Sequence, residues 1–207
     1  MSLICGIDEA GRGPLVGPVT AACVILPSDF DNSILHDSKK MTEKKRFEVA
    51  PIIKEKAIAW SFCHIDHTVI DRINILAATL LAMKSAFETL HDNYGNPVFI
   101  KDLPVSELVV DGTFLPHFDS KVVSSIGDVD CHPLVKADSK IASVMAASII
   151  AKTERDLLMK EYAKKYPQYE YEKNKGYATR RHYELIAKYG VSPIQRKSFS
   201  LKKLDEL

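Results

Sequence analysis

Three acidic residues lie where apolar segments of the sequence end. Asp8 and Glu9 close the short apolar run at 3–8, and Asp111 closes the run at 107–112. Such runs are typical of buried strands, and open α/β sheets bind ligands at the carboxyl ends of their strands. Carboxylates that meet there repel one another unless a proton or a cation intervenes, and oxygen-only ligands favour Mg²⁺ or Mn²⁺. The pattern predicts a divalent metal site.

Each acid also has an ordinary structural interpretation. Asp8 can be a loop residue after a strand, and Asp111 can belong to a turn with Gly112, since Asp-Gly is a common turn dipeptide. Asp138 precedes a long helical pattern, and aspartate caps helix N-termini well. No signal is specific alone, but their joint placement favours the metal site.

A glycine-rich loop at 11–18 follows the first two acids. It differs from a dinucleotide-binding fingerprint, because Val16 stands at the third glycine position and a strand-like run follows Pro18. Glycines beside acids allow backbone N–H groups to approach a ligand closely, and Arg12 is available for a phosphate. A purely structural turn is the alternative.

The cysteines and histidines offer a rival metal site, which we reject. Cys63, His64 and His67 lie close in sequence, and Cys131 and His132 could join them, but neither group has the spacing of a zinc site. Four dispersed cysteines argue against a disulfide framework and for a reducing compartment, so we expect a cytoplasmic protein. The N-terminal residues do not resemble a signal peptide, and no apolar run of about 18 residues predicts a membrane span.

The net charge of +1 conceals an uneven distribution. Residues 1–150 carry 14 Lys+Arg against 19 Asp+Glu, whereas residues 151–207 carry 14 against 8. From Lys173 to Lys203 there are nine basic residues and one acid, and Tyr169, Tyr171, Tyr177 and Tyr183 lie among or just before them. Basic side chains neutralise phosphates and aromatic rings stack on sugars or bases, so the segment predicts nucleic-acid binding. A solvated helix face with ordinary tyrosine packing is the alternative.

An α/β sheet must position these residues. Besides the two runs that end in acids, strands are expected at 19–26, 57–65 and 121–126. Helices are expected over 42–56 with a kink or break at Pro51, over 74–90 after a turn capped by Asp66, from Asp138 to about Lys165, and over 179–190 with Thr179 and Gly190 as caps. Strands followed by interleaved helices imply a sheet covered by helices, with a helical C-terminal extension.

Five segments together resemble ribonuclease HII, the bacterial type 2 ribonuclease H family. They are GIDEAGRGPLVGPV at 6–19, DSKKM at 37–41, VDG at 110–112, KADSKIASVMAASIIAKTERD at 136–156 and NKGYATRRHYELIAKYGVSP at 174–193. The resemblance implies a ribonuclease H-like mixed central sheet flanked by helices. It also implies a catalytic domain over 1–165 and a basic helical region over 166–207 that packs on it and binds substrate.

The resemblance also implies an activity and its residues. The family's acidic quartet corresponds to Asp8, Glu9, Asp111 and Asp138, which would be catalytic and hold two divalent ions, Mg²⁺ or Mn²⁺. Substrate contacts would come from Gly11, Arg12, Gly13, Lys39, Tyr177, Arg180 and Arg181. A monomer would cleave the RNA strand of RNA–DNA hybrids, and duplex DNA 5′ of a single embedded ribonucleotide, leaving 5′-phosphate and 3′-hydroxyl ends. A non-catalytic RNA–DNA hybrid-binding module is the alternative.

Overall fold

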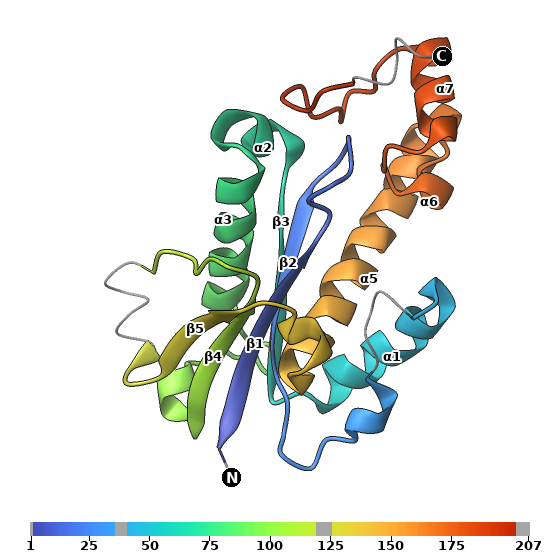
Figure 1. The fold of residues 1–207 in the computed structure, drawn as a ribbon. Helices are drawn as coiled ribbons and strands as arrows, with labels where there is room; N and C mark the ends of the chain where they lie inside the picture. The colour runs from blue at the N-terminus through green and yellow to red at the C-terminus, as the bar shows by residue number, and fades with distance from the viewer. Residues whose placement is uncertain (1, 36–40, 119–125, 202–207) are drawn as a thin grey trace.

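A five-stranded mixed sheet forms the centre of the molecule (Figure 1). The computed structural model describes residues 2–35, 41–118 and 126–201. The strands are β1 (Leu3–Ala10), β2 (Val19–Ile25), β3 (Ala59–Ile65), β4 (Val105–Asp111) and β5 (Asp130–Leu134), in the spatial order β3-β2-β1-β4-β5. The pairs β1–β2 and β2–β3 are antiparallel, and the pairs β1–β4 and β4–β5 are parallel. The expected mixed sheet is therefore confirmed.

Helices cover both faces of this sheet (Figure 1). One face carries α2 (His67–Ile73) and α3 (Ile75–Glu88), and the other carries α1 (Glu43–Lys56) and α5 (Ala142–Lys165). The short 3-10 helices are η1 (Asn32–Ile34), η2 (Ile100–Asp102), η3 (Ala137–Ser139) and η4 (Pro167–Tyr169). Beyond η4 come α6 (Tyr171–Asn174) and α7 (Arg180–Tyr189). No helix in the described ranges is long and apolar enough to cross a membrane.

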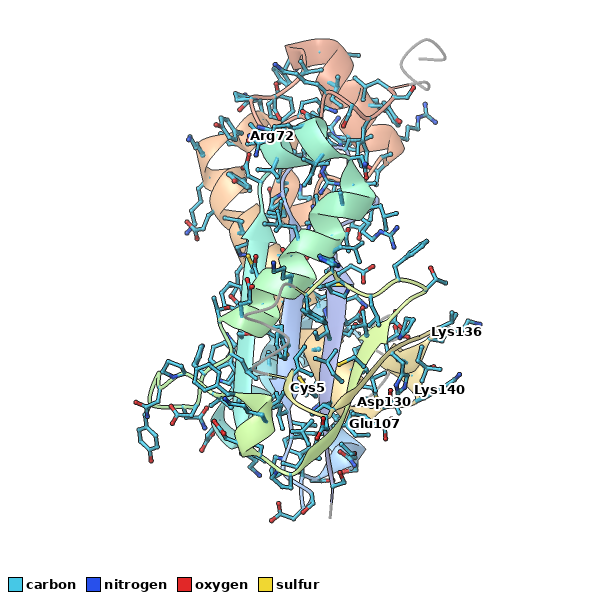
Figure 2. The ribbon with its side chains drawn as sticks, turned by 90° about the vertical axis from the view of Figure 1, so that its left-hand side faces the viewer. Cys5, Arg72, Glu107, Asp130, Lys136 and Lys140 are labelled. Atoms are coloured by element: carbon cyan, nitrogen blue, oxygen red, sulfur yellow. The ribbon has the colours of Figure 1, made fainter. Side chains whose placement is uncertain are left out.

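Alternating side chains along the strands divide the core into two layers. Cys5 and Ile7 of β1 pack with the α3 face, and Figure 2 shows Cys5 inside the molecule. Ala10 and the alternate β2 residues pack with α1 and α5. At Gly6 a Cβ atom would lie 2.4 Å from the backbone of Ser143, so only glycine lets α5 approach β1 this closely. The approach brings the start of α5 against the strand that carries Asp8.

Several expected boundaries are confirmed, and the expected break at Pro51 does not occur. Asp66 and Thr179 cap α2 and α7, and Gly190 follows α7 with a φ of 79°. Pro51 does not break α1, which continues to Lys56. A proline removes one backbone donor, but Val49, Ala50 and Ile53 are buried around it against the α5 layer and stabilise the helix.

The expected strand over 121–126 lies almost entirely outside the described residues, and Ile126 is helical. The sequence interpretation missed β5 instead. This edge strand tolerates Pro133 because only one of its sides pairs with another strand, and the burial of its residues does not alternate regularly. Its place beside β4 matters, since the chain leaves β5 at the same end of the sheet at which β4 ends.

The chain beyond α7 returns across the connection between β1 and β2 (Figure 1). The amide of Gly17 donates to the carbonyl of Ile194 at 2.9 Å, and the amide of Arg196 donates to that of Leu15 at 2.9 Å. Leu15 and Val16 also pack in one apolar cluster with residues of α5, η4, α6 and α7. The glycine-rich loop is therefore in contact with the C-terminal part of the chain. The domain division at 165/166 stays a prediction.

Candidate active site

Three carboxylates meet at the carboxyl ends of β1 and β4. Asp8, Asp111 and Asp138 each offer an oxygen atom, and these atoms all lie within 4.8 Å of one another. Parallel pairing aligns Ile7 of β1 with Val110 of β4, which places the next residues side by side. The backbone amide of Asp138 also donates to Asp111 Oδ1 at 3.4 Å. The expected meeting of acids at this edge is confirmed.

The interpretation of Asp138 as the N-cap of the long helix is wrong. The helix α5 begins at Ala142 with Ile141 as its N-cap, and Asp138 lies in η3. Lys136 adopts a left-handed conformation with a φ of 59°, which turns the chain just before η3. The side chain of Asp138 is consequently buried in the acidic cluster and not placed over the first turn of α5.

Glu9 lies beside this cluster, and its backbone amide donates to Asp8 Oδ1 at 2.7 Å. Its side chain pairs with Arg12 at 3.7 Å. It also lines a groove of about 290 Å³ together with Asp111 and the exposed ring of Phe114. Of the expected quartet, three acids form one cluster and Glu9 adjoins it from the groove.

Burial and mutual repulsion dominate the electrostatics of the acids. Burial raises the pKa of Asp8 well above its usual value, and the charges of Glu9 and Asp111 raise it further, whereas a hydrogen bond with Ser148 lowers it. Burial likewise raises the pKa of Glu9, and the charge of Arg12 opposes this shift. Buried oxygens that repel one another are what a divalent cation would neutralise, so the donor set fits a Mg²⁺- or Mn²⁺-type ion.

We expect Asp8→Asn to raise the Tm of the metal-free protein at neutral pH. The folded pKa of Asp8 lies above its unfolded value of about 3.9, so the wild type loses stability as pH rises from about 4 through the folded pKa. The amide has a similar shape and no charge, so it escapes this loss. Thermal unfolding in a chelator should show an advantage that disappears below about pH 4. A Tm difference between Asp8→Asn and wild type that did not depend on pH would show that the charge of Asp8 is not its cause.

The loop at 11–18 lies next to the acids and to Tyr177. Gly11 follows β1 directly with a φ of 91°, and a Cβ atom at Gly13 would lie 3.7 Å from Tyr177 Cε1. A second hollow of about 350 Å³ opens beside Gly11, lined by Arg46, Lys152 and Lys173 among others. The loop therefore lies between the acids on one side and the basic hollow with Tyr177 on the other.

Comparison with known proteins assigns this arrangement to a family. The family model for ribonuclease HII matches residues 5–202. The ribonuclease HII of Treponema denticola is 51% identical over 209 residues, which cover 98% of this chain and 100% of that protein. The one from Chlorobium luteolum is 47% identical, over 98% of this chain and 91% of that protein. The chain belongs to the ribonuclease HII family. It is therefore a metal-dependent endonuclease, as expected.

Solved structures confirm the expected ribonuclease H-like fold. The ribonuclease H2 from Pyrococcus horikoshii OT3 is similar with a TM-score of 0.73 and 23% identity, covering 99% of this chain and 97% of that one. A Bst-RNase HIII structure in complex with Mn²⁺ is similar with a TM-score of 0.71 and 19% identity, covering 99% of this chain and 70% of that one. Both share the sheet and its helical layers.

The basic segment of this ribonuclease HII chain is only partly exposed. Arg180 and Arg181 are exposed, and each pairs with a glutamate on α7 or just before α6. Lys175 is buried and pairs with Glu43 of α1, while Arg196 has no exposed surface. Lys39 lies outside the described residues. The expectation that the whole segment faces phosphates is therefore wrong for its two buried cations.

The tyrosines of the segment divide in the same way. Tyr169, Tyr171 and Tyr183 are buried in the apolar cluster around α7, so ordinary packing accounts for them. Tyr177 is 48% exposed, and its ring lies over the Arg155 guanidinium at 5.9 Å. Of the four, Tyr177 has the free face that stacking on a substrate requires.

Sequence reasoning missed Arg155 and Arg196, whose guanidinium groups are buried against the glycine loop. Arg155 stands in the charged half of a long helix, and Arg196 stands next to Lys197 in a basic stretch. Nothing in either pattern separates a buried cation from a solvated one. The loop carbonyls that they contact lie more than a hundred positions earlier in the chain, which local sequence does not reveal.

Proposed function

We propose that this ribonuclease HII hydrolyses the RNA strand of RNA–DNA hybrids and cuts duplex DNA 5′ of a single embedded ribonucleotide. The observation that carries the proposal is the cluster of Asp8, Asp111 and Asp138 directly beside the loop at 11–13. The carboxylates supply a site for phosphoester hydrolysis, and the loop supplies backbone amides within reach of the sugar. We further expect a monomer that acts in a reducing compartment, where its four free cysteines stay thiols.

The acids have distinct roles in this proposal. Asp8 and Asp111 are the principal metal ligands, while Glu9 and Asp138 complete the second metal position and orient the attacking water. Two divalent ions, Mg²⁺ or Mn²⁺, would when bound supply an activated water and positive charge at the departing oxygen. Asp8 and Asp138 are buried, which keeps bulk water from their carboxylates and strengthens the electrostatic interactions there.

The bond changes fix the products. The oxygen of water forms a bond to phosphorus in line with the bond from phosphorus to the 3′-oxygen, which breaks. The departing 3′-oxygen takes up a proton, and the proton lost by the water passes to solvent. The cut strands therefore carry a 3′-hydroxyl on one side and a 5′-phosphate on the other.

Sugar choice depends on the loop and on Tyr177. The 2′-hydroxyl is the group that distinguishes RNA from DNA at one nucleotide. We assign its recognition to the backbone of Gly11, Arg12 and Gly13. The ring of Tyr177 lies against the same loop and would stack on the deoxyribose that follows the ribonucleotide. Arg180, Arg181 and Lys39 would contact backbone phosphates.

One incubation tests the proposal. The protein is mixed with a duplex that carries one ribonucleotide, in Mg²⁺, in Mn²⁺ and in a chelator, and the product ends are analysed. We expect cleavage 5′ of the ribonucleotide with either ion, 5′-phosphate and 3′-hydroxyl ends, and no cleavage in the chelator. Binding of hybrid without products under all three conditions would favour the hybrid-binding module instead.

A further inference from the structure

We propose that Arg196 is a positioning residue that turns the backbone amides of Arg12 and Gly13 toward the substrate sugar. The proposal rests on the proposed function, because it explains how the sugar-reading loop gains its shape. Arg196 touches neither the acids nor the exposed surface. Its effect on the reaction would pass entirely through the loop.

The guanidinium of Arg196 uses all of its donors on the loop. An arginine side chain has five N–H donors in a fixed plane. Those of Arg196 are directed at five backbone carbonyls: Gly11 at 2.7 Å, Arg12 at 3.0 Å, Pro14 at 2.8 Å, Gly17 at 2.8 Å and Pro18 at 2.9 Å. One rigid fork thus fixes the orientation of the loop along most of its length.

Because each peptide unit is planar, the contacts of these carbonyls also determine the direction of the neighbouring amide groups. In a trans peptide the C=O of one residue and the N–H of the next point in opposite directions, and the described chain has no cis bond. Holding the Gly11 carbonyl inward therefore turns the Arg12 amide outward. Holding the Arg12 carbonyl inward does the same for Gly13. Within the described residues neither amide donates to another backbone or side-chain group.

The positive charge of Arg196 is stabilised by backbone carbonyl dipoles and not by an acidic side chain. No carboxylate of the described residues lies within 4 Å of its guanidinium, although Lys197 and Ser198 next to it are fixed by Asp71. Burial and the nearby Arg155 lower the pKa of Arg196 to about 9, so the group remains charged at neutral pH. A buried cation is tolerated only where strong acceptors surround it, and the loop carbonyls are those acceptors.

A second buried arginine supports the same loop from the other side. Arg155 donates to the carbonyls of Val16, Pro18 and Lys175 at 3.0 to 3.3 Å. A Cβ atom at Gly11 would lie 2.1 Å from Arg155 Nε, so a side chain there would displace this arginine. Arg155 donates no hydrogen bond to the carbonyls of Gly11 or Arg12, which leaves their orientation to Arg196.

The test compares Arg196→Lys with Ile186→Ala. Lysine keeps the charge but offers three donors on a single atom, so it cannot span five carbonyls. Ile186 belongs to the same apolar cluster as the loop and makes no hydrogen bond to it, so its truncation controls for lost stability. For each protein we would measure kcat and KM on the single-ribonucleotide duplex, Mn²⁺ affinity by calorimetry, and NMR order parameters of Gly11 to Gly13.

We expect Arg196→Lys to lose about 10²-fold in kcat/KM, because small misplacements of positioning groups cost that much. Its order parameters at the loop should fall from about 0.85 to below about 0.6, while Mn²⁺ affinity stays within about twofold. Ile186→Ala should melt earlier and keep both the loop order and kcat/KM within about threefold. Phe199→Leu removes the ring 5.0 Å from the guanidinium and should give a smaller loss in the same direction.

Three outcomes would overturn the proposal. They are an ordered loop in Arg196→Lys, a kcat/KM no lower than that of Ile186→Ala, and a parallel loss of Mn²⁺ affinity. If Arg196→Lys fails to fold, an unchanged loop in Phe199→Leu overturns it. A wild type that cuts no ribonucleotide substrate would refute the proposed function, and the order parameters would still decide whether Arg196 holds the loop.

Discussion

Asp8→Asn and Asp111→Asn should each lower the cleavage rate by at least about 10³-fold while hybrid binding is kept. In the proposed mechanism each carboxylate supplies charge to a metal position, and that charge acts mainly on the transition state. The amide preserves side-chain shape at these sites, so the sheet should fold normally. Single-turnover rates at saturating Mg²⁺ measure the first effect, and hybrid binding in a chelator measures the second.

Asp130→Asn is the matched control. Asp130 lies in β5 at the opposite end of the sheet from the acidic cluster, and Figure 2 shows it near Glu107 at the edge of the molecule. Its replacement also removes one carboxylate from the same sheet, so it reports the effect of charge alone. We expect a rate within about twofold of wild type. If Asp8→Asn or Asp111→Asn kept more than about a tenth of the wild-type rate, the ligand assignment would be wrong.

Tyr177→Ala should lower the cleavage rate about 5- to 150-fold on a duplex with one embedded ribonucleotide. This is the effect expected from the loss of one stacking contact. Its loss on an all-RNA strand paired with DNA should be much smaller. The ring is half-exposed beside the glycine loop, where it can stack on a deoxyribose but would be crowded by a 2′-hydroxyl. Initial rates on the two substrates, measured with one preparation, give the ratio.

Tyr183→Ala separates stacking from packing. Tyr183 is buried in α7, so its truncation should lower Tm and reduce both activities alike. Tyr177→Ala should leave Tm almost unchanged, because its ring contributes little to the apolar cluster. If Tyr177→Ala lost the same factor in rate on both substrates, the proposed stacking of Tyr177 on the deoxyribose after the ribonucleotide would be excluded.

The sheet and its acids were predictable because both leave local signals. Apolar runs bounded by glycine and proline correspond to β1, β2 and β4, and acids at their ends fall at the edge where parallel strands finish. The interpretation of Asp138 failed because the left-handed turn at Lys136 detaches it from the helix that follows. Lysine gives no local signal for such a turn.

The environment of the glycine loop was not predictable. Lys175 and Arg196 belong to a stretch whose composition is typical of a solvated basic face, yet they are buried. What buries Arg196 is a set of carbonyls about 180 residues earlier in the chain, and backbone acceptors have no sequence signature. Hydrophobic periodicity does not predict the conformation of loops. The contact between the loop at 11–18 and the chain after α7 is therefore visible only in the structure.

The contact between Arg196 and Gly11 joins residues 185 positions apart. The residues of the site are therefore synthesised at different times during translation. A ribosome adds about 5–20 residues per second, so roughly 3 to 12 s separate the addition of Asp138 from that of Arg196. Throughout this interval the growing chain contains all three clustered carboxylates but not Arg196, whose guanidinium contacts the loop carbonyls. The acids proposed to hold metal are thus added to the chain before the arginine proposed to orient the sugar-reading loop.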